Sequence, residues 1–356
     1  AALAHRGPDG GGQTVAAGAA LVHRRLAIID VEGGDQPLFE PGGAALIANG
    51  EIYSYRELRR DLLPDVAFAT GSDCEPALHL YRREGLGFAD RLRGMWAIAI
   101  HDRAARRVVL SRDPFGIKPL YIAETKQGLA FASEPRALLD AGLVPRGIDP
   151  PARDELLELQ FTTGAETIFP GIRRVLPGET IAIEEGRIVE RRRRAALPEG
   201  GPEAIDDEAA LARLDAVLTE SVDLHQRSDV PYGLFLSGGI DSAAVLALMR
   251  RLNDRPVLAF TAGFDDPSAA DERASARAAA RAAGAAHEEI TVTEADFWTH
   301  LPAIAAAMDD PAADYAIVPT WLLARRARQD VTVVLAGEGG DEIFGGYGRY
   351  RAAMRP

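Results

Sequence analysis

The chain has 356 residues, of which 47% are hydrophobic and 26% charged, so it can bury the cores of two domains. Its formal net charge of -13 argues against a nucleic-acid backbone as the main partner, and no apolar run reaches the roughly 18 residues of a membrane span. Cys74 is the only cysteine, which excludes a disulfide framework and a cysteine-based metal site and indicates a reducing, cytoplasmic compartment.

Short strands separated by turn residues predict an α+β domain in the first half of the chain. Apolar runs bounded by Gly, Asn or Asp occur at residues 44–53, 95–102, 106–113, 128–134 and 178–190. Two helical stretches interrupt them, at residues 54–63 and 74–85. Runs of strands with few helices are typical of a domain built around antiparallel sheet.

A stretch rich in Pro and Gly marks the boundary between two domains. Residues 191–207 are RRRRAALPEGGPEAIDD. Four arginines are compatible with a nucleic-acid patch, but the charge is local and the chain is acidic overall, so we interpret them as the solvated flank of a linker. The sequence predicts domains at residues 1–195 and 208–356, joined by a linker at 196–207.

From residue 208 onward strands and helices alternate, which predicts a doubly wound parallel sheet. The expected helices cover residues 208–226, 241–252, 271–284, 297–308 and 318–328. The expected strands cover residues 231–237, 257–264, 288–293 and 331–337. In such sheets, ligands collect beyond the carboxyl ends of the strands.

One of these strand ends carries a loop suited to binding an anion, the sequence SGGIDS from Ser237 to Ser242. Its glycines let the backbone approach a phosphate, and N–H groups at the start of the following helix supply positive potential. The loop lacks the lysine of a Walker A motif and the spacing of a dinucleotide fingerprint. A carboxylate beside phosphates is repulsive unless Mg²⁺ lies between them, so we interpret Asp241 as a metal ligand, with a helix N-cap as the alternative.

A second loop with the same features follows the last expected strand. Residues 337–350 are GEGGDEIFGGYGRY, in which Asp341 takes a place equivalent to that of Asp241. Two aspartates in equivalent strand–helix units predict a clamp for one Mg²⁺ on a pyrophosphate leaving group. Glu338 is placed to influence an acceptor carboxylate or a proton transfer.

SGGIDS resembles the pyrophosphate loop of ATP pyrophosphatases, which cleave ATP between the α and β phosphates to adenylate an oxygen. Together, DVPYGLFLSGGIDS and VVLAGEGGDEIFGGYGRY resemble the synthetase domain of glutamine-hydrolysing asparagine synthetases. This resemblance implies a Rossmann-like fold, a β-aspartyl-AMP intermediate that needs Glu338, ATP and Mg²⁺ as cofactors, and Mg²⁺ ligation by Asp241 and Asp341. The implied ATP-binding residues are Leu236, Ser237, Gly238, Gly239, Asp241, Ser242, Ala262, Ala336 and Gly337. Ala336 is a departure, because the family more often has serine there.

The first half offers the groups that free glutamine requires: an anion for its amino group, a cation for its carboxylate and donors for an oxyanion. The stretches HRRLAIID, NGEIY and GSDCE, with HRGPDG and SRDPFGIKPLY, resemble class II amidotransferases, which have an N-terminal-nucleophile αββα sandwich. On that pattern Arg25 holds the carboxylate, Glu51 and Asp73 orient the amino end, and Asn49 with the Gly50 N–H forms the oxyanion hole. The implied glutamine-binding set is Arg25, Leu26, Ala27, Ile28, Ile29, Asn49, Gly50, Glu51 and Asp73.

The nucleophile of that family is a cysteine at the chain terminus, whose free amine serves as base. We therefore reject Cys74 as nucleophile, although it directly follows Asp73. Because Ala1 already lies beside HRGPDG and the chain ends soon after the second glycine loop, we expect it to lack the first strand with the nucleophile and to be incomplete at its C-terminus.

The leading interpretation is a cytoplasmic ligase that converts aspartate to asparagine with glutamine and ATP. A homodimer is one assembly that such an enzyme can form. One alternative is a related amidotransferase for another carboxylate in polysaccharide, peptide or secondary-metabolite biosynthesis. Another is a non-catalytic sensor of glutamine or nucleotide. The segment 308–320 is expected to border the acceptor site, with Asp309, Asp310 and Asp314 as solvated loop acids.

Overall fold

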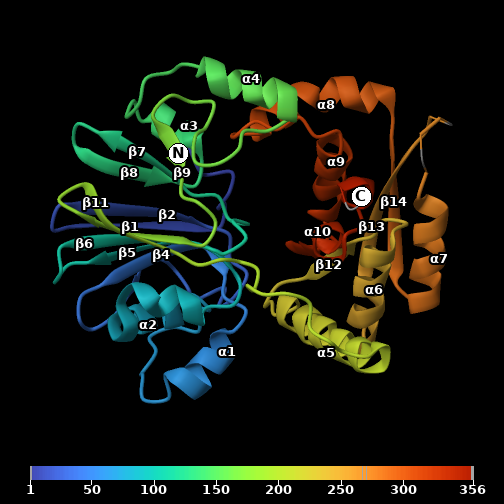
Figure 1. Cartoon of the computed structure of the whole chain (residues 1–356), viewed down its shortest axis with the longest axis horizontal. Helices are drawn as coiled ribbons and strands as arrows, with labels where there is room; N and C mark the ends of the chain where they lie inside the picture. The colour runs from blue at the N-terminus through green and yellow to red at the C-terminus, as the bar shows by residue number, and fades with distance from the viewer. Residues whose placement is uncertain (1, 267, 270, 354–356) are drawn as a thin grey trace. The chain divides into compact units, whose positions relative to one another are not determined.

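The computed structural model describes residues 2–353 except 267 and 270. The chain divides into two compact units, whose elements are labelled in Figure 1. The first unit runs to Pro202 and also includes Met308–Asp314, and the second comprises Glu203–Ala307 and the residues from Tyr315 onward.

A six-stranded antiparallel sheet forms the centre of the first unit, in the order β11-β10-β6-β5-β4-β3. The central strands β4 and β5 are buried almost throughout because layers cover both of their faces. The strands are β3 (Leu38–Phe39), β4 (Ala45–Glu51), β5 (Met95–Asp102), β6 (Arg107–Arg112), β10 (Glu179–Glu184) and β11 (Arg187–Arg193).

Helices cover one face of this sheet and further strands cover the other. Leu78 and Phe88 pack with Trp96 and Ile98 in the core under the helical layer, which comprises α1 (Tyr55–Glu57), a π-helical turn (Leu58–Leu62), α2 (Glu75–Glu84) and a 3₁₀ stretch (Gly85–Arg91). The opposite layer comprises the sheet β8-β7-β9 and the hairpin β1-β2, with bounds β1 (Gly10–Ala16), β2 (Ala19–Arg25), β7 (Tyr121–Thr125), β8 (Gly128–Ala132) and β9 (Ile172–Arg174).

A second core lies between the two layers of strands, where Leu21, Ile122 and Ile181 pack together. A third core joins the β8-β7-β9 sheet to the outer helix α3 (Pro135–Asp140), with α4 (Pro150–Leu159) following in the chain. The unit is thus layered helix, sheet, sheet, helix, and the predicted αββα sandwich is confirmed.

Several strands and α-helices of this unit were not predicted, namely β1, β2, β3, β7, β9, α3 and α4. The hairpin β1-β2 lacks a continuous apolar run because only one face of β1 is even partly covered. Residues 178–190 are two strands rather than one, since Glu185 and Gly186 take positive φ and turn the chain. The arginine run is exposed as expected, but it ends strand β11, where Arg191 pairs with Glu179.

The second unit contains the predicted parallel sheet, in the order β14-β13-β12-β15. The strands are β12 (Tyr232–Phe235), β13 (Leu258–Phe264), β14 (Ala286–Val292) and β15 (Val333–Leu335). The chain builds outward from β12 to β14 and then returns to the other side of β12. The neighbouring ends of β12 and β15 therefore form a topological switch point, the usual ligand site of such folds.

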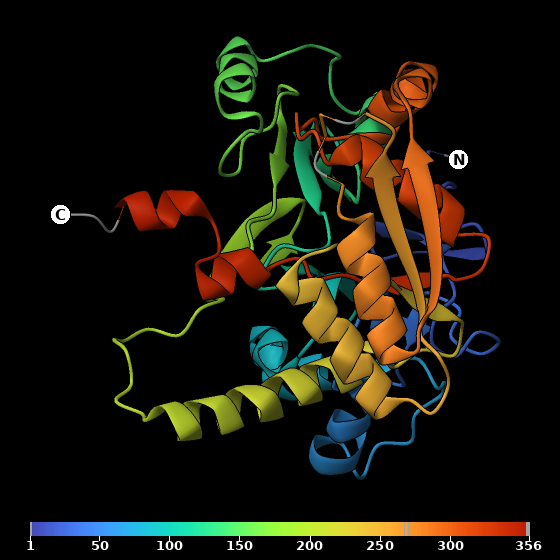
Figure 2. The same cartoon turned by 90° about the vertical axis from the view of Figure 1, so that its right-hand side faces the viewer.

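Helices lie on both faces of this sheet. The core on one face joins α5 (Asp207–His225), α6 (Ile240–Leu252) and α7 (Arg273–Ala283), of which α6 and α7 lie side by side in Figure 2. On the other face, α9 (Ile317–Ala327) packs against Phe260 through Leu323 and Ala327. The remaining helices are α8 (Glu294–Ala307), α10 (Gly340–Phe344) and α11 (Gly348–Ala353).

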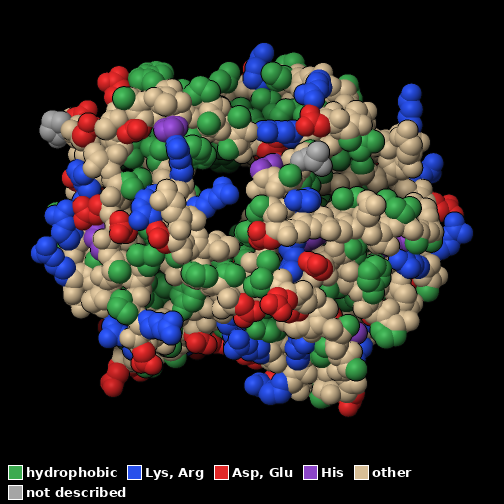
Figure 3. Space-filling view, turned by 180° about the vertical axis from the view of Figure 1, so that it is seen from behind, with side chains coloured by type: hydrophobic (Ala, Val, Ile, Leu, Met, Phe, Trp, Pro, Cys, Tyr) green, Lys and Arg blue, Asp and Glu red, His purple; other side chains and the backbone are tan. Residues whose placement is uncertain are grey.

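Within the described residues, no helix is both long enough and apolar enough to cross a bilayer. On the face drawn in Figure 3, basic and acidic side chains are interspersed over the surface.

Candidate functional site

The first unit contains a cavity of about 810 Å³ that brings together most of the residues predicted to bind glutamine. Strand β4, the loop after β2 and the loop before α2 supply these residues, while β8 and α3 complete the wall. Of the predicted set, only Ala27 does not line the cavity, and its N–H donates to Asp9 at 2.9 Å. The cavity-lining members are Arg25, Leu26, Ile28, Ile29, Asn49, Gly50, Glu51 and Asp73.

Two buried carboxylates stand together in this cavity. Glu51 is 7% exposed and Asp73 is 6% exposed, and the N–H of Ile52 donates to Asp73 at 2.7 Å. Burial, followed by repulsion from Asp73, raises the pKa of Glu51 to about 7. Burial also raises the pKa of Asp73 to about 6. A cationic group entering the cavity would favour the ionised form of both.

Asn49 and Gly50 are neighbours on β4 that both line the cavity. Asn49 Nδ2 is buried and has no hydrogen-bond partner among the described residues, so its N–H groups are available to a ligand. A Cβ at position 50 would lie 2.2 Å from the carbonyl oxygen of Met95, so the neighbouring strand admits only glycine there. Strand β4 therefore presents the Asn49 amide donor in the cavity wall, next to a position that only glycine can occupy.

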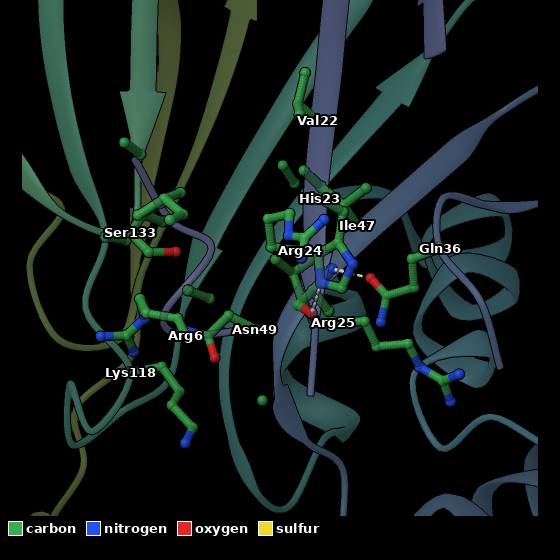
Figure 4. A pocket seen from close by; sticks show the side chains of 18 of the residues that line it. Arg6, Val22, His23, Arg24, Arg25, Gln36, Ile47, Asn49, Lys118 and Ser133 are labelled. Carbon is green, nitrogen blue, oxygen red and sulfur yellow. Dashed lines mark hydrogen bonds between the residues drawn. The ribbon is translucent and has the colours of Figure 1, made fainter. Parts of the chain in front are cut away.

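Arg25 has a structural role that the sequence did not predict. Its terminal nitrogens donate to the carbonyl oxygens of Ile29, Asp30 and Val31, at 3.1, 2.6 and 3.0 Å, and to Asp35 at 3.2 Å. The guanidinium thereby holds the loop after β2 that carries Ile28 and Ile29 into the cavity wall. Figure 4 shows Arg25 extending away from Asn49.

Sequence reasoning missed Lys118, Arg6 and His5, which also line the cavity. Lys118 and Arg6 lie on the same side of it as Asn49 in Figure 4, and burial lowers the pKa of Lys118. His5 and Arg6 both contact Glu134, at 2.9 and 3.0 Å. Lys118 lies in SRDPFGIKPLY, a stretch that already resembles the amidotransferase family. Its place in that stretch is the sequence signal that could have identified it.

Cys74 is poorly suited to act as a nucleophile. It is 2% exposed, and burial raises the pKa of its thiol well above the ordinary range. Since the thiolate is the reactive form, this environment keeps the sulfur inert.

In the second unit, the two predicted phosphate loops lie against each other at the switch point. Strand β12 pairs with β15 through Leu234 and Leu335, so both loops leave the same sheet edge. A Cβ at Gly337 would lie 2.7 Å from the Ser242 nitrogen, and one at Gly340 would lie 2.6 Å from the Asp241 carboxyl carbon. The glycines thus allow the Asp241 carboxylate to reach the start of α10, which also carries Asp341.

The other predicted nucleotide residues lie on the same edge or next to it. Leu236 is buried at the end of β12, Ala262 lies on the neighbouring strand β13, and Ala336 follows β15. Glu338 is exposed, in the turn between Gly337 and α10.

The backbone of the first loop already contacts oxygen acceptors. The Ser237 N–H donates to the Ser242 hydroxyl and the Gly239 N–H to the Ser237 hydroxyl, both at 3.1 Å. The Gly238 N–H donates to a carboxylate oxygen of Glu272, also at 3.1 Å. An acidic side chain therefore binds where the loop offers an N–H to an anion.

The donor set of this edge fits a magnesium ion bound mainly by phosphate and water. The carboxylates of Asp241 and Asp341, in the first turns of α6 and α10, are hard oxygen donors, and among the residues described no group of three or more His, Cys, Asp or Glu side chains forms a protein-only metal cage. Mg²⁺ commonly takes one or two carboxylates together with substrate phosphates.

The expectation that Asp309 and Asp310 are solvated is wrong. Asp310 accepts hydrogen bonds from Tyr121 at 2.7 Å and from Arg174 at 2.8 and 2.9 Å. Asp309 accepts from the backbone and side chain of Arg136, at 2.9 and 3.1 Å. The side chain of Asp310 is only 16% exposed and that of Asp309 only 11%, whereas Asp314 is exposed as expected.

Comparison with known families covers both units. The family model described as "Glutamine amidotransferase domain" matches residues 1–193, and that described as "Asparagine synthase" matches residues 213–356. The chain thus joins an amidotransferase domain to a synthase domain.

The names of individual curated relatives are more specific than the descriptions of these two family models. The chain is 41% identical to a "Putative asparagine synthetase [glutamine-hydrolyzing]" of Mycobacterium tuberculosis and 36% identical to "Asparagine synthetase [glutamine-hydrolyzing] 1" of Bacillus subtilis, over 99% of this chain in both cases. It is 31% identical over 98% of its length to "Amidase chry2" of Gibberella zeae. The chain spans 57%, 55% and 55% of the lengths of these three relatives. It belongs to the family of glutamine-hydrolysing asparagine synthetases.

Proposed function

We propose that the protein carrying this chain converts aspartate to asparagine with ATP and glutamine. A side-chain carboxylate oxygen of aspartate attacks the α-phosphorus of ATP, which releases pyrophosphate and leaves β-aspartyl-AMP. Ammonia released from glutamine then attacks the acyl carbon and displaces AMP. The first unit is assigned the release of ammonia and the second unit the activation of the acid.

In the first unit, this chain binds and orients glutamine. Glu51 and Asp73 hold the α-ammonium group, and Asn49 Nδ2 with the Gly50 N–H stabilises the oxyanion formed at the amide carbon. Arg25 is assigned to the α-carboxylate, which requires its terminal nitrogens to exchange hydrogen bonds with the loop that they now hold. Cys74 is not assigned the role of nucleophile, because it is buried and burial raises the pKa of its thiol.

In the second unit, the backbone of Ser237–Ser242 cradles the pyrophosphate part of ATP, which displaces Glu272 from the Gly238 N–H. Asp241 and Asp341 would hold Mg²⁺, which neutralises charge that builds up on the leaving pyrophosphate. Leu236, Ala262, Ala336 and Gly337 border the adenosine part. Glu338, exposed in the turn that precedes α10, is assigned to the acceptor carboxylate or to a proton transfer beside it.

One observation carries the proposal: the approach of the Asp241 carboxylate to Gly340 across the switch point. Two glycine loops that each carry an aspartate, at adjoining ends of parallel strands, suit a phosphate–metal site better than they suit two independent helix caps. Asn49, with its unpartnered amide in a cavity that holds two buried acids, supports glutamine as the donor.

The test is release of pyrophosphate by the whole protein with ATP and Mg²⁺, with ammonia or glutamine as donor, across a panel of acids. One relative is named an amidase, so carboxylic acids other than aspartate belong in the panel. We expect aspartate to stimulate pyrophosphate release and asparagine to form in equal amount. Stimulation only by another acid would replace asparagine synthesis by a related amidation, and stimulation by no acid would leave a sensor as the better explanation.

A further inference from the structure

The segment Met308–Asp314 connects α8 to α9, two helices of the second unit, yet it belongs to the first compact unit. The chain therefore passes from the second unit to the first and back within this short stretch. Three separate contacts hold the segment, at Asp309, Asp310 and Ala313.

The contact at Asp310 is the strongest of the three. Arg174 Nε lies 2.8 Å from Oδ2 and Nη2 lies 2.9 Å from Oδ1, so the guanidinium binds the carboxylate in a two-pronged manner. The Tyr121 hydroxyl donates to Oδ2 at 2.7 Å. Arg174 and Asp310 are 14% and 16% exposed, and a largely buried ion pair of this kind is expected to fix a geometry more than to add net stability.

The contact at Asp309 leads directly to the glutamine cavity. Arg136, in the first turn of α3, binds Asp309 through its backbone N–H and its guanidinium. The next two residues, Ala137 and Leu138, line the cavity. A shift of the segment therefore moves one wall of the glutamine cavity through a single short helix.

In the other direction along the chain, the segment leads to the parallel sheet that carries the residues assigned to ATP. Asp314 is followed by α9, whose Leu323 and Ala327 pack on Phe260 of β13. Strand β13 also carries Ala262, one of the residues assigned to ATP. The segment is thus packed within the first unit and covalently continuous with a helix that packs on β13 in the second.

We propose that Asp310, bound by Arg174 and Tyr121, is a positioning residue that couples glutamine hydrolysis to the use of the released ammonia. The inference rests on the proposed function. Without the ion pair the segment loses the one of its three contacts that joins it to β7 and β9, and ammonia is then released without matching synthesis.

The test compares Asp310→Asn and Arg174→Gln with the wild-type whole protein in three assays: glutaminase activity, synthesis from ammonia and synthesis from glutamine. We expect synthesis from glutamine to fall about tenfold and glutamine consumed per product to rise by a similar factor, while synthesis from ammonia stays within about twofold. The double variant is expected to be no worse than either single variant, because both remove the same interaction. The control is Arg173→Gln, next to Arg174 on β9, which removes an exposed ion pair with Glu166. It should change none of the three activities.

An equal fall in synthesis from ammonia and from glutamine, or an unchanged ratio of glutamine to product, would overturn the inference. Should these variants fail to fold, Tyr121→Phe is tested instead, because it removes only one hydrogen bond to Asp310. We expect it to raise the glutamine consumed per product by a smaller factor, and no rise would overturn the inference. The wild-type protein separates the two proposals: if it makes no product from ammonia, the proposed function itself fails before any variant is compared.

Discussion

The two candidate sites are built in opposite ways. In the first unit, charged side chains are buried in a cavity, with Glu51 and Asp73 at 7% and 6% exposure. In the second unit, exposed loops meet at a sheet edge and backbone groups replace side chains. A free amino acid is recognised by a few charges whose effect grows as water is excluded, whereas phosphates are recognised by N–H groups, glycines and a metal ion. Substitutions in one site should therefore leave the chemistry of the other intact.

The largest expected effect is on the acid-activating half-reaction. Asp241→Asn or Asp341→Asn removes a proposed Mg²⁺ ligand, and we expect aspartate-dependent pyrophosphate release to fall about 100-fold or more. Glutaminase activity should stay within about twofold, because no residue of the glutamine cavity is altered. Equal loss of both activities would show that the metal has been assigned to the wrong residues.

The reciprocal effect is expected from Asn49→Ala, which removes the unpartnered amide donor. We expect glutamine hydrolysis to fall about 100-fold, the usual cost of an oxyanion donor, with synthesis from added ammonia unchanged. Assays of glutamate and asparagine in the same samples measure both. Loss of ammonia-dependent synthesis as well would contradict the separation of the two sites.

A smaller effect concerns pH. Since the pKa of Glu51 is about 7, its carboxylate is mostly protonated at pH 6 and mostly ionised at pH 8. Only the ionised form attracts the ammonium group of glutamine, so KM for glutamine should fall about tenfold between these values. KM values for ATP and aspartate are the internal comparison and should not follow the same curve.

The same carboxyl group has a consequence for stability. Its pKa is raised in the folded state, so its stabilising contribution is present below about pH 4.5 and is lost as pH rises through about 7. Glu51→Gln keeps the neutral form at all pH values. We expect the variant to gain of order 1–3 kcal/mol in unfolding free energy at pH 8 relative to the wild type, and nothing near pH 4.5. Urea titrations at the two pH values measure this difference, and an equal effect at both would contradict the assigned titration.

The smallest effect is expected from Cys74→Ala. The substitution removes a buried sulfur and should cost about 1 kcal/mol of stability, while glutaminase activity stays within about twofold. Loss of hydrolysis without loss of folding would make Cys74 the nucleophile after all.

The parts of the fold that follow local patterns were predictable. The alternation after residue 208 predicted the parallel sheet, and SGGIDS and GEGGDE identified the loops at its switch point because glycine and aspartate requirements are local there. The αββα layers were likewise confirmed, although the hairpin β1-β2 was missed because it carries no continuous apolar run.

What could not be predicted depends on distant partners. Asp310 is 136 residues from Arg174 and 189 from Tyr121, so no local pattern distinguishes it from a solvated loop acid. Arg25 was assigned from its segment, but its bonds to Ile29, Asp30 and Val31 depend on how the loop after β2 folds back. In both cases the sequence shows the residue type but does not show which residues it contacts in the fold.

The central claim is that the second unit adenylates a carboxylate, and isotope transfer tests it most directly. Aspartate labelled with ¹⁸O in its side-chain carboxylate is incubated with the whole protein, ATP, Mg²⁺ and ammonia, and AMP is analysed by mass spectrometry. Because ammonia displaces AMP at the acyl carbon, one labelled oxygen should remain on the phosphate of each AMP formed. AMP that forms without label would contradict adenylation at this site.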